Sequence, residues 1–145
     1  MSLIETLLEA WGWCGIAPSE VVGENDFGNL MIKDDSGRYW RLCPEDLYCK
    51  VVAQNRGELD ALQTNQEFLR DWYATGLVDY ASSKLGVLAE GRKYCLKIPS
   101  VLGGAYGEDN IGTIALEELV RASGHIAREI KDLPDGSKVK IKVVD

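Results

Sequence analysis

The stretch from Val101 to Gly112, VLGGAYGEDNIG, contains four of the chain's 15 glycines and is called the glycine loop. Glycine-rich loops bind phosphate when they follow the pattern G-x-G-x-x-G or G-x-x-x-x-G-K-[ST]. Gly103, Gly104, Gly107 and Gly112 fit neither pattern, and the carboxylates of Glu108 and Asp109 would repel phosphate. We therefore expect either a turn that needs positive φ at one or more glycines, or a loop that exposes Tyr106 and the two acids to a partner protein.

Nucleophilic or metal chemistry would have to use four cysteines and one histidine, which are Cys14, Cys43, Cys49, Cys95 and His125. The cysteines show no C-x-x-C spacing, and the sequence contains no G-x-S-x-G elbow. A structural zinc site needs about four nitrogen or sulfur ligands in a compact cluster. We interpret the cysteines as buried free thiols and the histidine as a surface residue near a helix N-terminus, and we predict no cofactor.

Carboxylates are abundant, with 23 Asp and Glu residues against 16 Lys and Arg. Chance pairs are common in such a chain, so an Asp/Glu pair in the pocket of a small hydrolase or ligand-binding domain remains an alternative. Asp34 and Asp35 lie between two strand-forming runs, where Asp is ordinary turn chemistry. The same pair could instead present negative charge outward, beside Tyr39.

The elements that position these residues follow from the hydrophobic pattern. Ser2 and Glu5 fit a capping box ahead of a short amphipathic helix. The runs NLMIK and RYWRL, joined by DDSG, predict a β-hairpin, and YCKVVA predicts a third strand. A single helix is expected from Gly57 to Ala74, ended by Gly76.

The second half of the chain predicts a strand at KYCLKI and a strand running into a helix at GTIALEELVRASG. Ser123 is expected to cap a further short helix, followed by a turn at LPDG and an alternating strand at KVKIKV. This order of elements predicts an α+β fold. We expect a single domain over residues 1–145, with a mostly antiparallel β-sheet packed by several helices.

The net charge of −7 at pH 7 limits the possible partners. Nucleic acids and anionic membranes attract basic surfaces, so a basic or mixed-charge protein is the expected partner, with no direct nucleic acid or membrane contact. The first residues lack a basic region and carry Glu5 and Glu9 within their apolar stretch, unlike a signal peptide. No apolar run approaches the roughly 18 residues of a membrane span. We therefore expect a cytoplasmic protein.

Motifs in the last third of the chain resemble the C-terminal domain of type VI secretion immunity proteins of the Tdi type. They are P-x-x-L-G-G-x-Y at 99–106, N-I at 110–111 and S-G-x-I-A-x-x-I-K-x-L-P-D-G at 123–136. The run GNLMIKDDSGRYWRL resembles, more weakly, the strand-turn-strand near the start of that domain. The resemblance implies a protein that binds a toxin made by the same cell and blocks its active site. The resemblance also implies a toxin that cleaves DNA or destroys NAD, because similar immunity proteins pair with such toxins. It provides no catalytic residues to transfer to this chain.

The expected partner is therefore a cognate secreted toxin, bound one-to-one, that acts in the cytoplasm as a nuclease or NAD-degrading enzyme. Carboxylates suit such a target because they can occupy an electropositive, phosphate-binding cleft. The expected contacts lie in two acidic turns and are Asp34, Asp35, Tyr39, Tyr106, Glu108 and Asp109. A regulatory scaffold unrelated to toxins is a further alternative to the hydrolase or ligand-binding domain.

Overall fold

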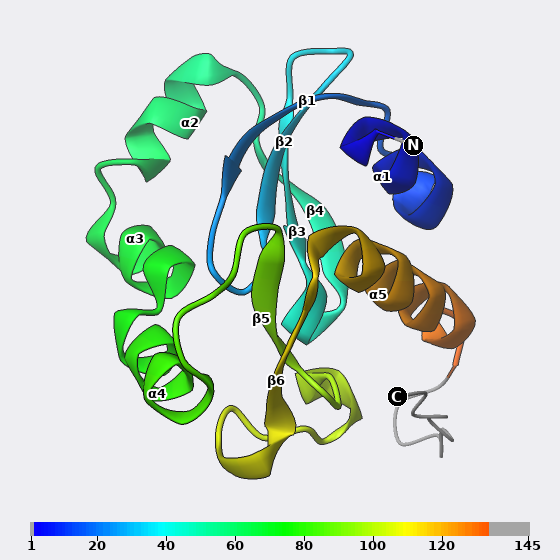
Figure 1. Cartoon of the computed structure of the whole chain (residues 1–145). Helices are drawn as coiled ribbons and strands as arrows, with labels where there is room; N and C mark the ends of the chain where they lie inside the picture. The colour runs from blue at the N-terminus through cyan, green and yellow to red at the C-terminus, as the bar shows by residue number, and fades with distance from the viewer. Residues whose placement is uncertain (1, 134–145) are drawn as a thin grey trace.

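The computed structural model describes residues 2–133, which form two antiparallel sheets (Figure 1). The larger sheet has the strand order β1-β2-β3-β4, with β1 at Pro18–Glu24, β2 at Leu30–Asp34, β3 at Tyr39–Cys43 and β4 at Tyr48–Ala53. The smaller sheet pairs β5 (Arg92–Leu96) with β6 (Ile111–Ala115). The predicted α+β fold is confirmed, while the KVKIKV run lies outside the described residues.

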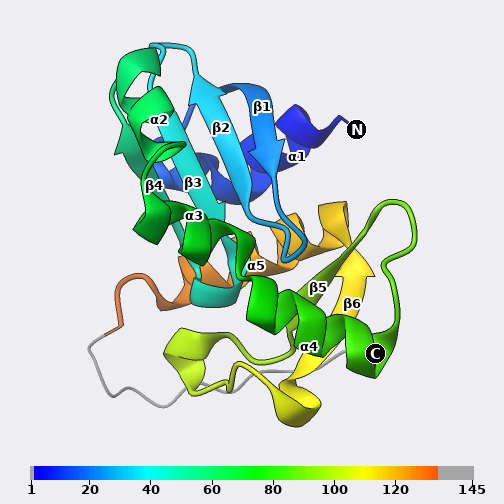
Figure 2. The ribbon, with the colours of Figure 1, turned by 90° about the vertical axis from the view of Figure 1, so that its left-hand side faces the viewer.

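Helices cover both faces of the larger sheet (Figures 1 and 2). One face carries α1 and α5, and the other carries α2 and α3, with α4 beside the smaller sheet. The bounds are α1 Leu3–Trp11, α2 Arg56–Leu62, α3 Gln66–Tyr73, α4 Thr75–Leu85 and α5 Leu116–Ile130. Short 3-10 turns lie at η1 Gly12–Cys14, η2 Pro44–Asp46, η3 Ser100–Leu102 and η4 Glu108–Asn110.

The two faces of the larger sheet follow from the alternation of side chains along each strand. Ile32 and Leu42 are fully buried against α1 and α5, and Trp11 of α1 joins the same core. Met31 and Tyr39, which alternate with that set, pack instead against α2 and α3. Each strand of the central hairpin is therefore apolar on both faces, as expected for a sheet covered on both sides.

A third apolar core joins the smaller sheet to α4, with Phe27, Ala81, Tyr94, Leu96 and Ile111 at its centre. Tyr94 N donates a hydrogen bond to Asp26 O at 2.8 Å, which fastens β5 to the connection between β1 and β2. The core packed against α2 and α3 and the core packed against α4 are separate clusters. Side chains that lie between these two cores are therefore not enclosed by apolar contacts on every side. This junction is where the polar side chains described below gather.

Several predicted elements are confirmed in the structure. Glu5 N donates to Ser2 Oγ at 3.2 Å, so Ser2 caps α1 as its motif predicts. The hairpin forms as β2 and β3, and YCKVVA is β4 without any shift of its ends. KYCLKI contains most of β5, and GTIALEELVRASG is a strand that runs directly into a helix. Trp11 and Trp72 are buried, at 1% and 8% exposure.

Other predicted boundaries are wrong. The helix expected from Gly57 to Ala74 is two helices, because the Asn65 side chain accepts a hydrogen bond from Phe68 N at 3.0 Å and caps a new helix. Gly76 lies inside α4 and does not end a helix. Ser123 also lies inside a helix, α5, where its hydroxyl donates to Leu119 O at 2.7 Å. Strand β1 was not predicted at all.

His125 is exposed, as predicted, but it lies in the second half of α5 and not near its N-terminus. The predicted short helix starting at Ser123 was the reason for that placement. Since α5 runs unbroken from Leu116 to Ile130, the histidine is an ordinary residue of the helix surface.

Gly124 marks the closest approach of α5 to α1. A Cβ atom at this position would lie 2.4 Å from Ala10 O. We expect Gly124→Ala to lower the free energy of unfolding by about 1–3 kcal/mol through overpacking, although Ala is the better helix former by about 1 kcal/mol. Gly76→Ala is the matched control, because open space surrounds that helical glycine. It should raise stability by about 0.4–1 kcal/mol in urea denaturation. Stabilisation by both changes would contradict the close approach.

Candidate functional site

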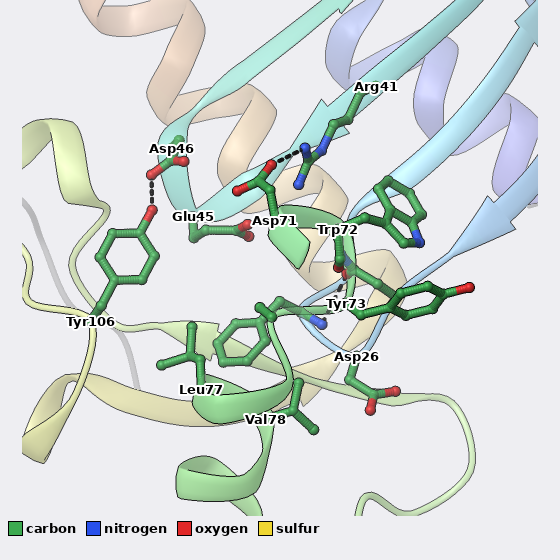
Figure 3. Close-up of a pocket in the computed structure, with 13 residues that line it drawn as sticks. Asp26, Arg41, Glu45, Asp46, Asp71, Trp72, Tyr73, Leu77, Val78 and Tyr106 are labelled. Atoms are coloured by element: carbon green, nitrogen blue, oxygen red, sulfur yellow. Dashed lines mark hydrogen bonds and ion pairs between the residues drawn. The ribbon is translucent and has the colours of Figure 1, made fainter. Parts of the chain in front are cut away.

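Arg41 is the most deeply buried charge at the junction between the cores, with 5% of its surface exposed. Its Nε donates to Asn29 Oδ1 at 3.0 Å, and its Nη1 forms an ion pair with Asp71 of α3 (Figure 3). The guanidinium also lies 5.1 Å from the ring centroid of Trp72. Arg41 therefore connects β3, the residue before β2 and α3 through one group.

Asn29 extends this network toward η2. Its Nδ2 donates to both carboxylate oxygens of Glu45, at 2.8 and 2.9 Å. The Cys43 thiol donates to Glu45 Oε1 at 3.0 Å. Burial raises the pKa of the Glu45 carboxyl, while these hydrogen bonds oppose that change. Both oxygens of the Glu45 carboxylate thus accept hydrogen bonds from within the chain.

Cys43, Glu45 and Asp46 are the residue types that bind metals, and their ligand atoms lie within 4.8 Å of one another. Burial and the neighbouring Glu45 raise the pKa of the Cys43 thiol, so this thiol stays protonated and acts as a donor. A metal would need the thiolate, and a structural zinc site needs about four ligands. The arrangement is better explained as a hydrogen-bonded network than as a metal centre.

A cleft of about 190 Å³ opens next to this network, between η2 on one side and α3 and α4 on the other (Figure 3). Apolar and aromatic side chains form its wall on the helices, and they include Trp72, Tyr73, Leu77 and Val78. Its titratable lining is acidic, with Asp26, Glu45, Asp46 and Asp71 against Arg41. The cleft therefore offers an aromatic surface with an excess of negative charge.

The glycine loop closes the far side of the cleft and is held in one conformation by local bonds. Gly103 has φ +92°, which confirms the turn with positive φ expected from the sequence. A Cβ atom on Gly104 would lie 1.7 Å from Ile98 O, so only glycine fits there. The Asn110 side chain accepts from Ile98 N at 2.9 Å and donates to Ala105 O at 2.8 Å. Gly103 thus supplies the positive φ of the turn, and Gly104 allows the close approach of the backbone.

Tyr106 projects from the glycine loop over the cleft. Its hydroxyl donates to Asp46 of η2, and Ser100 donates to the same carboxylate oxygen. Burial and the adjacent Asp46 raise the pKa of Tyr106, which keeps the hydroxyl protonated as a donor. The residue as a whole remains 47% exposed. The loop thus presents an aromatic ring whose polar end is fixed.

The hairpin turn predicted to present negative charge outward does so only in part. Asp34 is 3% exposed, and its carboxylate accepts hydrogen bonds from Trp40 Nε1 at 2.8 Å and from Arg38 Nε at 2.9 Å. Although burial opposes ionisation, these and backbone hydrogen bonds lower the pKa of Asp34. Tyr39 is also 3% exposed. The outward placement of Asp34 and Tyr39 is wrong, because the first closes the turn from inside and the second belongs to the core.

The two predicted groups of contact residues do not come together. Asp35, Tyr106 and Asp109 are exposed, while the side chain of Glu108 lies outside what the structure describes. Asp35 lies in the turn before β3, and Tyr106 contacts η2, which follows β3. The length of β3 separates these ends by roughly 13 Å at about 3.3 Å per residue. Figure 1 shows the hairpin turn and the glycine loop at opposite ends of the molecule.

The residues that shape the cleft were missed by the sequence analysis, and they include Asn29, Arg41, Glu45, Asp46 and Asp71. One signal was present, since Arg41 alternates with Tyr39 and Cys43 and must share their face of the strand. A charged residue on a strand that is apolar on both faces must find a partner inside the fold. The identity of that partner has no sequence signal.

The part of the chain that matches a known family includes the helical wall of the cleft and the glycine loop. Residues 53–127 match the family described as T6SS immunity protein Tdi1, C-terminal, which is more than half of the chain. The chain belongs to this family. The match runs from the end of β4 into α5 and confirms the resemblance based on the motifs around the glycine loop. The T6SS immunity family indicates a protein whose partner is a cognate toxin and favours a binding protein over an enzyme.

Among curated proteins, none matches the chain. Within residues 2–133, no helix has both the length and the apolar character that a membrane span requires.

The four cysteines are free thiols and lie away from the open part of the cleft. Cys43 and Cys49 are buried, as predicted, whereas Cys14 and Cys95 are half-buried. A hydrogen bond from the Cys49 side chain lowers the pKa of Cys14 to about 7. Burial raises the pKa of Cys95. Cys14 is therefore the thiol with the most thiolate character near neutral pH.

We expect iodoacetamide to label Cys14 first, because the thiolate is the reacting form. The labelling rate should rise between pH 6 and pH 8 with a midpoint near the pKa of about 7. Mass spectrometry of peptides at each pH would give the rate for each thiol. Cys95, which is also half-buried, serves as the internal control. Equal rates for Cys14 and Cys95 at pH 7 would contradict the assigned difference.

Replacing Arg41 tests the network beneath the cleft. Arg41→Met should lower the free energy of unfolding by about 1–3 kcal/mol, because the buried Asn29 Oδ1 loses its donor. Arg56→Met is the control, since Arg56 forms an exposed ion pair with Asp60 on α2 and should have almost no effect. Chemical denaturation followed by tryptophan fluorescence measures both. Similar stabilities for the two variants would mean that the network adds nothing to the fold.

Proposed function

We propose that this protein is an immunity protein that binds a cognate type VI secretion toxin in the cytoplasm and inhibits it by covering the toxin's active site. The toxin is a nuclease or an NAD-degrading enzyme, bound one-to-one. The observation that carries the proposal is the family match over residues 53–127.

The charge of the chain supports a toxin that acts on a phosphate-containing substrate. Such toxins need an electropositive cleft, and a partner with a net charge of −7 is attracted to it. Complementary charge raises the association rate and makes it depend on salt. Specific complexes of this kind bury about 1,600 Å² in total.

The alternative of a carboxylate-based hydrolase receives little support from the cleft. Glu45 has a raised pKa, which is typical of catalytic acids, but Asn29 and Cys43 already occupy its oxygen atoms. Asp46 is similarly engaged by Ser100 and Tyr106. Carboxylates that already accept several internal hydrogen bonds are less suited to proton transfer to a substrate.

Co-expression tests the proposed function. The cognate toxin, sought first among the products of neighbouring genes, should arrest growth when expressed alone, and this chain should restore growth. The two proteins should co-purify as a one-to-one complex by light scattering, with a dissociation constant near nanomolar, equivalent to about −12 kcal/mol.

A toxin of the same class from an unrelated locus is the control and should remain lethal in the presence of this chain. Growth arrest that persists although both proteins are folded and abundant would contradict the proposal. So would turnover of a small molecule by the purified chain that is lost in Glu45→Gln.

A further inference from the structure

We infer that the toxin docks over the cleft between α3–α4 and the glycine loop, with Tyr73 and Tyr106 as its anchors and a lysine- or arginine-rich surface as its contribution. This inference rests on the proposed function and adds the location of the interface and the chemistry of the partner. Four observations lead to this surface.

The first observation is the aromatic character of the cleft rim. Tyr73, the last residue of α3, is 61% exposed, and Tyr106 on the opposite wall is 47% exposed. Between them, Leu77 lines both the cleft and a shallow apolar hollow formed with Tyr80 and Gly107. Exposed large apolar side chains that gather in this way mark interaction surfaces, and tyrosine is enriched among the residues that dominate binding energy.

The second observation is that Tyr106 is already held in place. Its hydroxyl is bonded to Asp46, and the backbone behind it is fixed by Asn110 and by the tight packing of Gly104. Immobilising a flexible side chain on binding costs free energy, and a ring ordered beforehand avoids most of that cost. A fixed, half-exposed aromatic ring suits recognition of another protein.

The third observation is the charge around the anchors. Four carboxylic acids line the cleft, and the guanidinium of Arg41 is the cation among its lining residues. That guanidinium is buried and already bonded to Asn29 and Asp71. Asp26 lies exposed at the rim, without an ion-pair partner among the bridges of the described residues. Lysine or arginine on the toxin would complement the carboxylates that have no cationic partner, which are Asp26, Glu45 and Asp46.

The fourth observation concerns the other end of the sheet. At the hairpin turn, Asp34 and Tyr39 are buried, and Asp35 is the exposed acid of the pair. Asp35 is a single exposed carboxylate without an exposed aromatic anchor beside it, and the hollow that Tyr39 lines lies on the face of the sheet covered by α2 and α3, where Arg56 would repel a basic partner. The cleft is therefore the better candidate for the toxin-binding site than the hairpin turn.

Binding to the toxin, purified with its catalytic residue inactivated, tests this location by surface plasmon resonance at two salt concentrations. Tyr106→Ala should weaken binding by at least roughly 30-fold, as expected for a dominant interface residue. Asp26→Lys should weaken binding by at least roughly tenfold, mainly through slower association, and should flatten the dependence on salt. Tyr106→Phe keeps the ring but not its bond to Asp46, so it should lie between wild type and Tyr106→Ala.

Asp35→Lys is the matched control, because it makes the same change of charge at an exposed site on the opposite end of the sheet. It should bind within roughly threefold of wild type. Circular dichroism and thermal unfolding check that each variant folds. If Tyr106→Ala does not fold, Tyr73→Ala is measured in its place. If wild type binds but the cleft variants bind equally well, or if Asp35→Lys loses as much affinity as Asp26→Lys, this location is wrong and the proposed function stands. If wild type does not bind the toxin at all, the proposed function itself fails.

Discussion

The buried guanidinium of Arg41 joins parts of the chain that are distant in sequence. Removing such an ion from water costs several kcal/mol, so the fold is stable only where donors and counter-charges surround it. Asn29 and Asp71, which lie 12 and 30 residues away, supply them. The position of α3 against the sheet is therefore coupled to this one side chain. Because Tyr73 ends α3 and α4 begins two residues later, the same coupling places the helical wall of the cleft.

Local patterns predicted the elements that are stabilised locally. The hairpin and β4 were correct because alternation and turn chemistry act over a few residues. The break between α2 and α3 was missed because the apolar stripe continues in phase from Leu59 to Trp72 and hides it. Asn65 offers the backbone a side-chain acceptor in place of the helical bond, which is the usual competition between asparagine and helix continuity. Ser123 shows the converse case, since its hydroxyl bonds back within an uninterrupted helix.

The cleft was not predictable because its defining contacts cross the fold. Tyr106 and Asp46 are 60 residues apart, and nothing in the spacing of either residue indicates the other. Asp34 is different, because the alternation of β2 puts it on the same face as Leu30 and Ile32. That pattern already favoured an inward carboxylate, and the Trp40 indole across the hairpin supplies the donor that makes burial possible. Composition of the turn alone led to the opposite expectation.

The internal neutralisation of Arg41 shows how one junction can stabilise the fold and still form the docking surface proposed above. Its positive charge is paired with Asp71, so Asp26, Glu45 and Asp46 are the acids of the cleft that keep no cationic partner among the described residues. Asp46 has two roles. It accepts the hydrogen bond that orients Tyr106, and its carboxylate contributes negative charge to the lining of the cleft. A surface of this kind is rigid, aromatic and negative before any partner arrives. Little ordering then remains to be done on binding, and most of the interaction free energy is available for affinity.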